Sequence, residues 1–224
     1  MLVNGKWEGP IVDQHMHLDR ENRFISAAQE FSRSGGTGIF LVHKPSFSKS
    51  LPTDLDGYRA VYRNTIEMAQ IVRKKTELEV NVVLGPHPVV WDLQANEIGL
   101  KESSELHISA VGLALDMIEE GEAVCLGEVG RPHYEVSEEK WSEANRILLE
   151  IMQMAASSKS PIQLHVEDNG NQTCREIASM CDKAGLPRSR AVRHFAPPDI
   201  SQQKTSGLPV TVSMGKGRVE GICS

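Results

Sequence analysis

Short apolar runs alternate with longer amphipathic stretches along most of the chain. The short runs are rich in Val, Ile and Leu and are apolar on both faces, which is typical of parallel strands that are covered on both sides. They predict seven strands, at residues 11–17, 38–45, 80–87, 123–129, 162–166, 191–195 and 210–214.

Amphipathic stretches between these runs predict helices. Apolar residues recur at helical spacing in residues 23–33, 54–75 and 105–120. Ser137 can cap a further helix whose first turn carries two glutamates, and a helix that begins near Asn171 should end at Gly185. Strands that alternate with helices predict a parallel sheet, either a (β/α)8 barrel or an open doubly wound sheet.

The number of strands favours the barrel. A complete (β/α)8 barrel takes about 250 residues, whereas this chain has 224 and ends just after its seventh predicted strand. We therefore expect an α/β protein of the TIM-barrel type, with seven strands and without the eighth strand and its flanking helices. No linker or repeat divides residues 1–224, so we expect a single domain.

Composition restricts the classes of partner. Hydrophobic residues make up 40% and charged residues 24%, with a formal net charge of −6. Such a chain has no basic excess for a wide nucleic-acid interface, so any nucleic-acid contact should be local or metal-mediated. No apolar run reaches the ~18 residues that span a membrane, and residues 1–10 lack a signal sequence. We expect a cytoplasmic protein without membrane contact and without an obligate protein partner.

Polar residues with metal-binding chemistry close several of the predicted strands. His15 and His17 are two apart and should share one strand face, with Asp13 placed to orient a ligand imidazole. Four more strands end on one such residue each, namely His87, Glu128, His165 and His194. Because the carboxyl ends of barrel strands meet at one rim, these side chains should converge there. Imidazoles and a carboxylate predict a site for one or two divalent ions such as Zn, Mn or Mg.

The motifs that carry these residues resemble those of the TatD-like metal-dependent hydrolases, in particular the archaeal-type branch. The matching segments, in chain order, are DQHMHLD at 13–19, GPHP at 85–88, GEVGRPHY at 127–134, LHVED at 164–168 and RHF at 193–195. The resemblance implies a (β/α)8 barrel and metal-dependent hydrolysis, often of phosphodiester bonds in DNA.

The same resemblance implies roles for individual residues. His15, His17 and Glu128 would hold a first metal, and Glu128, His165 and His194 a second. Glu128 and His87 are the expected catalytic residues, His87 as a contact to the substrate phosphate. Lys44, Arg131 and His133 are expected substrate contacts near the rim. His107 is expected on the solvated side of its helix, and Trp141 as a packing residue.

One element of the resembling family lies beyond this sequence. The family has a further ligand, an aspartate that closes the eighth strand, and the chain ends at Ser224 before such a strand. The 224 residues should therefore be slow or inactive by themselves, as a fragment or a shortened form. Two alternatives remain open: a hydrolase of lactones, amides or phosphotriesters, and a non-catalytic metal-binding remnant. Related barrels often bridge their metals with a carbamylated lysine, and Glu128 in that place favours the TatD-like branch.

Overall fold

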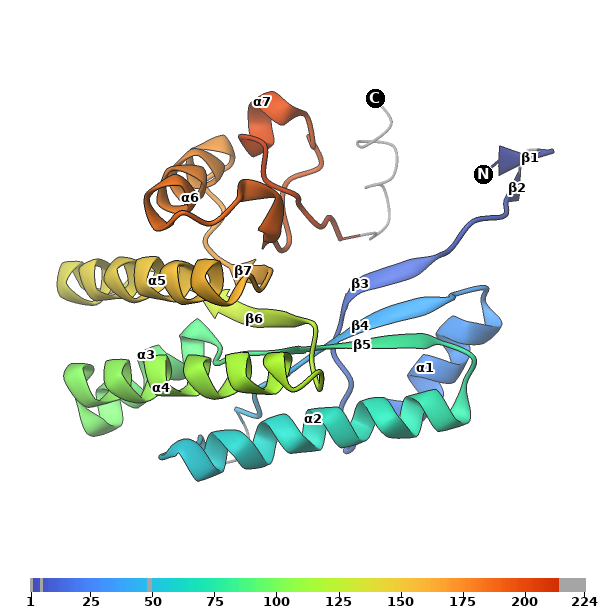
Figure 1. Cartoon of the computed structure of the whole chain (residues 1–224), viewed down its shortest axis with the longest axis horizontal. Coiled ribbons are helices and arrows are strands. Elements are labelled where there is room, and N and C mark those ends of the chain that lie inside the picture. Colours follow the sequence, from blue (N-terminus) through green and yellow to red (C-terminus); the bar gives the residue numbers. More distant parts are fainter. Residues whose placement is uncertain (1, 5, 48–49, 214–224) are drawn as a thin grey trace.

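The computed structural model describes residues 2–4, 6–47 and 50–213 and contains one main sheet of six parallel strands (Figure 1). The strands are β3 (Val12–Met16), β4 (Gly38–Val42), β5 (Glu79–Leu84), β6 (Cys125–Gly130), β7 (Ile162–His165) and β8 (Ala191–Arg193). Neighbours in the sheet are also neighbours in the chain. A doubly wound sheet reverses its strand order at a switch point, so this sequential order is that of a TIM-type barrel and confirms the expected fold class.

Helices follow most of the strands and lie in chain order along the curled sheet, from α2 through α4 and α5 to α6 (Figure 1). The helices are α1 (Phe24–Arg33), α2 (Leu55–Lys75), α3 (Pro88–Ile98), α4 (Leu100–Glu119), α5 (Glu138–Ser158), α6 (Asn171–Ala184) and α7 (Gln202–Thr205), with a 3-10 turn η1 at Arg188–Arg190. A small antiparallel hairpin, β1 (Leu2–Val3) and β2 (Lys6–Trp7), precedes β3 and projects away from the sheet (Figure 1).

The predicted seventh strand is reduced to an isolated parallel bridge. Val210 pairs with Arg193 of β8, and the backbone N–H of Thr211 donates to the Arg193 carbonyl over 3.0 Å. The last residue predicted for this strand, Met214, lies outside the described residues. Within the described part of the chain, β3 and β8 are the two edges of the main sheet, so the barrel wall is open between them.

Local signals place most helix ends where the sequence predicts them. The Asp54 carboxylate accepts from the backbone N–H of Gly57 at the start of α2, and Ser137 caps α5 in the same way. Gly185 ends α6 with a φ of +71°, a conformation that favours glycine. Helix α3 was not predicted; His87 caps it and Pro88 occupies its first turn.

The core lies between the sheet and the helices, and it contains one residue that the sequence analysis misplaced. His107 of α4 is 1% exposed, so the expectation of a solvated surface position is wrong. Its neighbours at helical spacing, Ser103, Ser104, Ala110 and Val111, are buried as well. Among the described residues, no helix is long and apolar enough to cross a membrane.

Candidate metal centre

Two of the predicted ligands sit at irregularities in the sheet. Between the pairs Asp13–Ile39 and Met16–Leu41, strand β3 has one residue more than β4, and His15 lies in that bulge. Strand β6 has one extra residue relative to β7 between Leu126 and Val129, where Glu128 lies. A bulge re-aims the side chain that it carries and is common beside active sites.

Asp13, expected to orient a ligand imidazole, contacts the backbone instead. Its carboxylate accepts from the backbone N–H of His15 over 2.9 Å and does not hold a ligand imidazole. At the end of β6, Gly130 has a φ of +154°, and a Cβ there would lie 1.9 Å from the carbonyl oxygen of His165. Only glycine permits this close approach, which brings the ends of β6 and β7 together.

His15, His17 and Glu128 meet at one point. The Nε2 atoms of the two imidazoles lie 3.2 Å apart. Glu128 Oε2 lies 3.4 Å from His15 Nε2 and 3.3 Å from His17 Nε2. Glu128 is 3% exposed, so water cannot fully solvate its charge.

Hydrogen bonds on the far side of each imidazole determine where its proton lies. His15 Nδ1 is 3.0 Å from Gln163 Oε1, and His17 Nδ1 is 3.1 Å from the carbonyl oxygen of Val42. The Gln163 amide is oriented because its Nε2 donates to the carbonyl of Gln14. Both Nδ1 atoms therefore donate, which leaves the two Nε2 lone pairs directed at each other and at a carboxylate oxygen.

Three acceptors that face one another require a positive charge between them. A divalent ion supplies it, and neutral imidazoles with a carboxylate are ligands that zinc and similar ions take. Protons are the competing cation. For His17, burial lowers the pKa, but the Glu128 carboxylate outweighs it and the pKa lies above its ordinary value. The arrangement thus fits a divalent metal on the chemistry of its donors.

His165 and His194 complete the group. His165 Nδ1 is 3.0 Å from Glu128 Oε1, so the carboxylate faces His15 and His17 with one oxygen and His165 with the other. The His194 ring stacks on that of His15, with centroids 3.5 Å apart. Donor atoms lie within 4.8 Å of one another in each of two sets: His15, Glu128 and His194, and His87, Glu128 and His165. The structure therefore brings all five predicted metal ligands to one cluster. It groups His194 with His15 and Glu128, whereas the resemblance implied a set of His194 with Glu128 and His165.

Glu128 is the centre of this cluster in charge as well as in position. Burial opposes its ionisation, but the imidazoles of His15, His165 and His17 outweigh that effect when they carry protons in place of a metal ion, and they hold the pKa of the carboxyl well below its usual range. Burial lowers the pKa of His194 to about 4, so this imidazole is neutral at neutral pH and has a lone pair to offer a metal. No aspartate joins either set of donors within the described residues.

His87 is placed to donate a hydrogen bond. Its Nδ1 accepts from the backbone N–H of Val89 over 3.1 Å, as the cap of α3. Burial lowers the pKa of His87 to about 3, so the ring is neutral and its single proton lies on Nε2. That Nε2 lies 3.8 Å from Glu128 Oε2. His87 thus turns an N–H toward the cluster, which suits a contact to a substrate oxygen better than metal ligation.

The three predicted substrate contacts differ in their surroundings. Lys44 pairs with Asp19 over 2.8 Å and is about half exposed at the rim. His133 is exposed, and its Nδ1 lies 2.7 Å from Nε2 of His165, so it does reach the cluster. Arg131 is 2% exposed and is occupied within the protein.

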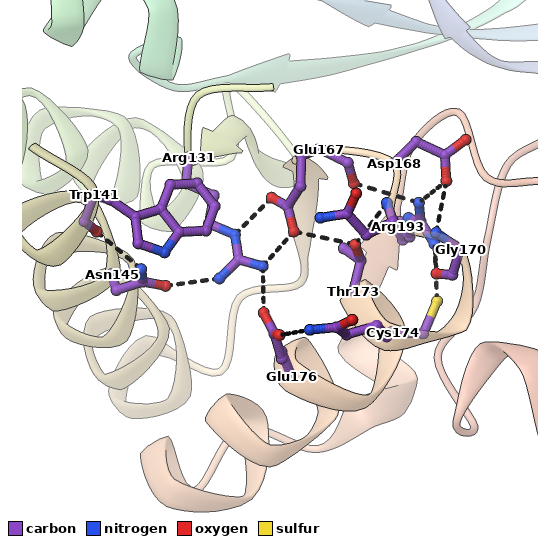
Figure 2. Close-up of polar contacts among 12 residues, drawn as sticks. Arg131, Trp141, Asn145, Glu167, Asp168, Gly170, Thr173, Cys174, Glu176 and Arg193 are labelled. Carbon is purple, nitrogen blue, oxygen red and sulfur yellow. Dashed lines mark hydrogen bonds and ion pairs between the residues drawn. The ribbon is translucent and has the colours of Figure 1, made fainter. Parts of the chain in front are cut away.

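Arg131 forms part of a buried polar network (Figure 2). Its guanidinium binds both oxygens of Glu167, donates to Glu176 over 2.8 Å and to Asn145 over 2.7 Å, and lies over the Trp141 ring. A side chain held in this way has no free face for a substrate. The predicted substrate contact does not fit this arrangement, which instead ties the ends of β6 and β7 to α5 and α6.

Arg193 holds the chain that follows Glu167, at residues 168–170 after β7 (Figure 2). It donates to Asp168 over 2.8 Å and to the Gly170 carbonyl over 2.9 Å. Glu167 and Asp168, which follow β7, are therefore paired with arginines and are not free bases for the cluster. The sequence signalled these acids only as part of a motif and could not identify their partners.

Comparison with known proteins identifies the family. The family model described as TatD related DNase matches residues 12–217. An uncharacterized protein of Methanocaldococcus jannaschii is 28% identical over 188 residues, which are 83% of this chain and 65% of that relative. The chain thus spans about two thirds of the length of the curated relative that it matches.

Solved structures share the fold at low sequence identity. The TatD-like protein of Archaeoglobus fulgidus is 17% identical with a TM-score of 0.52, over 82% of this chain and 67% of that one. The phosphotriesterase homology protein of Escherichia coli is 13% identical with a TM-score of 0.61, over 93% and 72%. With the family model matching nearly the whole chain, this protein belongs to the TatD related DNase family.

Proposed function

We propose that this protein is a divalent-metal-dependent hydrolase that cleaves phosphodiester bonds with an activated water. The observation that carries the proposal is the convergence of His15 Nε2, His17 Nε2 and Glu128 Oε2, which lie within 3.4 Å of one another while both Nδ1 atoms face acceptors. The family of the chain supports the same reaction class.

The roles of the residues follow from their hydrogen bonds. His15, His17 and Glu128 would hold one ion, with His194 beside His15 available to the same ion, and Glu128 and His165 would contribute to a second. Zn, Mn or Mg bound there would lower the pKa of a water molecule and polarise a phosphoryl oxygen. Gln163 and the Val42 carbonyl keep the protons of His15 and His17 away from the metal side.

His87 would stabilise the charge that develops on the substrate. Its Nε2–H points toward the cluster, and burial keeps it neutral, so it can donate to a phosphoryl oxygen without repelling the metal. His133, whose Nδ1 lies 2.7 Å from His165, is the exposed residue best placed to meet the substrate from the solvent side. Asp19 partly neutralises the charge of Lys44, so Lys44 would be a weaker substrate contact than an unpaired lysine.

The test measures bound metal and the hydrolysis of bis(p-nitrophenyl) phosphate by the 224-residue chain with added Mn²⁺ or Zn²⁺, at a high protein concentration because a chain of this length is expected to be slow. Glu128→Gln keeps the shape of the side chain and removes its charge, so bound metal and hydrolysis should fall together. The loss should exceed the roughly 10–100-fold that removal of an outer-shell partner typically costs. Glu97→Gln, a charge-neutralising change at an exposed position on α3, is the matched control and should keep full metal content and rate.

Three results would contradict the proposal. Metal content is measured on Glu128→Gln protein that circular dichroism shows to be folded, so that a folding defect is not mistaken for a loss of metal binding. Unchanged metal content and an unchanged rate in this variant would exclude the mechanism. Hydrolysis of a phosphotriester or a lactone in the absence of diester hydrolysis would replace the proposed reaction by the alternative one. A folded chain that binds metal and cleaves none of these would be a metal-binding protein without this activity.

A further inference from the structure

A cavity of about 420 Å³ opens beside the metal cluster. The segments that follow β3 and β4 form its walls together with the first half of α2. His87 also lines it, and the Nε2 atom of His87 lies 3.8 Å from Glu128 Oε2. The cavity therefore borders on the position where a scissile bond would lie, and its volume is within the about 300–1,000 Å³ of small-molecule sites.

The inner walls of this cavity are apolar. Leu18, Tyr58, Met68 and Val90 line it and are buried, and Val61 lines it as a half-buried side chain. Contact with such walls favours a group that loses little hydration when it leaves water. The inner part of the cavity, with its apolar walls, thus suits an uncharged organic group and not an ion.

The charges at its rim cancel one another. The lining contains two cations, and Lys44 is paired with Asp19 over 2.8 Å, while Arg20 binds Asn64 over 2.8 Å and Glu67 over 3.4 Å. Each cation therefore already faces a carboxylate, so the rim has no positive excess that would attract a second phosphate. A nucleic-acid strand carries one phosphate per nucleotide and is bound mainly through cations.

A histidine in the lining has one ring nitrogen that faces no hydrogen-bond partner within the part of the chain that the structure describes. His43 is 8% exposed, and its Nδ1 lies 3.1 Å from the hydroxyl of Thr65, whose own proton is donated to the Val61 carbonyl. Nδ1 is then the protonated nitrogen, and Nε2 is an acceptor with no hydrogen-bond partner among the described residues. An available acceptor in the lining of a largely apolar cavity can orient a neutral organic group that enters it.

We propose that this cavity binds the uncharged organic group of a small phosphate ester whose phosphoryl group lies at the metal cluster. The inference rests on the proposed function, because that function places the phosphoryl group at Glu128. It narrows the substrate to a small molecule with one phosphate and a neutral, largely apolar substituent.

The experiment compares two monoesters that differ only in that substituent. Phenyl phosphate and methyl phosphate are titrated calorimetrically into the Mn²⁺-loaded 224-residue chain, at a pH where both are dianions. Burial of the phenyl ring should make phenyl phosphate bind on the order of tenfold to a hundredfold more tightly. This binding readout does not depend on turnover.

A variant that fills the cavity localises the effect. Ala60 lines the cavity from an exposed position on α2, so Ala60→Phe adds a ring without removing a buried contact. It should abolish the preference for phenyl phosphate and leave the affinity for methyl phosphate unchanged. Gln70→Phe, at an exposed position of the same helix outside the lining, should keep the preference.

Failure of this inference is distinguishable from failure of the proposed function. Equal affinity of the wild-type chain for the two monoesters, or binding of neither, overturns the cavity assignment even if diester hydrolysis is found. An unchanged preference in Ala60→Phe overturns it as well, as does faster cleavage of a single-stranded oligonucleotide than of aryl diesters. If the chain binds phenyl phosphate more tightly than methyl phosphate but does not hydrolyse diesters, the proposed reaction is overturned and the cavity remains a binding site.

Discussion

Replacing His107 by leucine should make the stability of the protein less sensitive to acid. His107 lies in α4 and is 1% exposed, and its Nδ1 has no hydrogen-bond partner among the described residues. Burial alone lowers its pKa from 6.5 to about 3. Leucine is of similar size and carries no polar atom, so the substitution removes the titrating group with little change in packing.

The sign and size of the effect follow from proton linkage. The folded protein holds His107 neutral down to a pH near 3, whereas the unfolded chain takes up a proton below pH 6.5. Protonation of His107 therefore takes nothing from the free energy of unfolding well above pH 6.5. Below that pH the free energy of unfolding falls progressively, until the pH reaches the pKa of His107 in the folded protein. Between pH 7 and pH 5 the loss amounts to about 2 kcal/mol, and it depends little on the folded pKa while that remains below about 4.

Urea unfolding of wild-type and His107→Leu chains at pH 7 and pH 5, followed by circular dichroism, measures this effect. The variant should be equally or slightly more stable at pH 7, because an unpaired buried nitrogen is removed. The difference in free energy of unfolding between the variant and the wild type should be about 2 kcal/mol larger at pH 5 than at pH 7, in favour of the variant. The histidines of the metal cluster titrate in both proteins and cancel in the difference. Gln70→Leu, at an exposed position, should show no such dependence, and a constant difference for His107→Leu would refute the buried neutral imidazole.

Three further outcomes are expected. Gln163→Leu should lower metal affinity by roughly 10–100-fold with the fold retained, since His15 loses the acceptor that orients it; calorimetric titration with Zn²⁺ measures this, and unchanged affinity would contradict the assigned tautomer. Glu167→Gln should lower the free energy of unfolding by about 3 kcal/mol and Glu176→Gln by less than about 1 kcal/mol, because Glu167 is the more buried partner of Arg131. Chemical unfolding measures both losses, and equal losses would refute this ranking. Divalent metal should raise the unfolding temperature and a chelator reverse the rise, whereas indifference to both would argue against a metal centre.

Much of the fold and of the metal cluster could be predicted from local patterns in the sequence. Apolar runs and caps are short-range signals, so the strand and helix order and ends such as Asp54, Ser137 and Gly185 follow from neighbouring residues. The ligands were predictable because parallel strands bring their carboxyl ends together whatever the details of packing, so polar residues at those ends must meet.

Tertiary structure alone decided what each side chain faces. Gln163 is 148 residues from His15, and nothing in its own strand indicates that it orients this imidazole. Arg131 stands in a motif at the rim, yet Glu167 and Glu176 bind it inside the protein. His107 is polar but lies on the buried side of its helix because α4 packs on several neighbours. Periodicity determines which residues share a face, whereas burial and hydrogen-bond partners depend on segments far away in the chain, and these meet only when the sheet has curled.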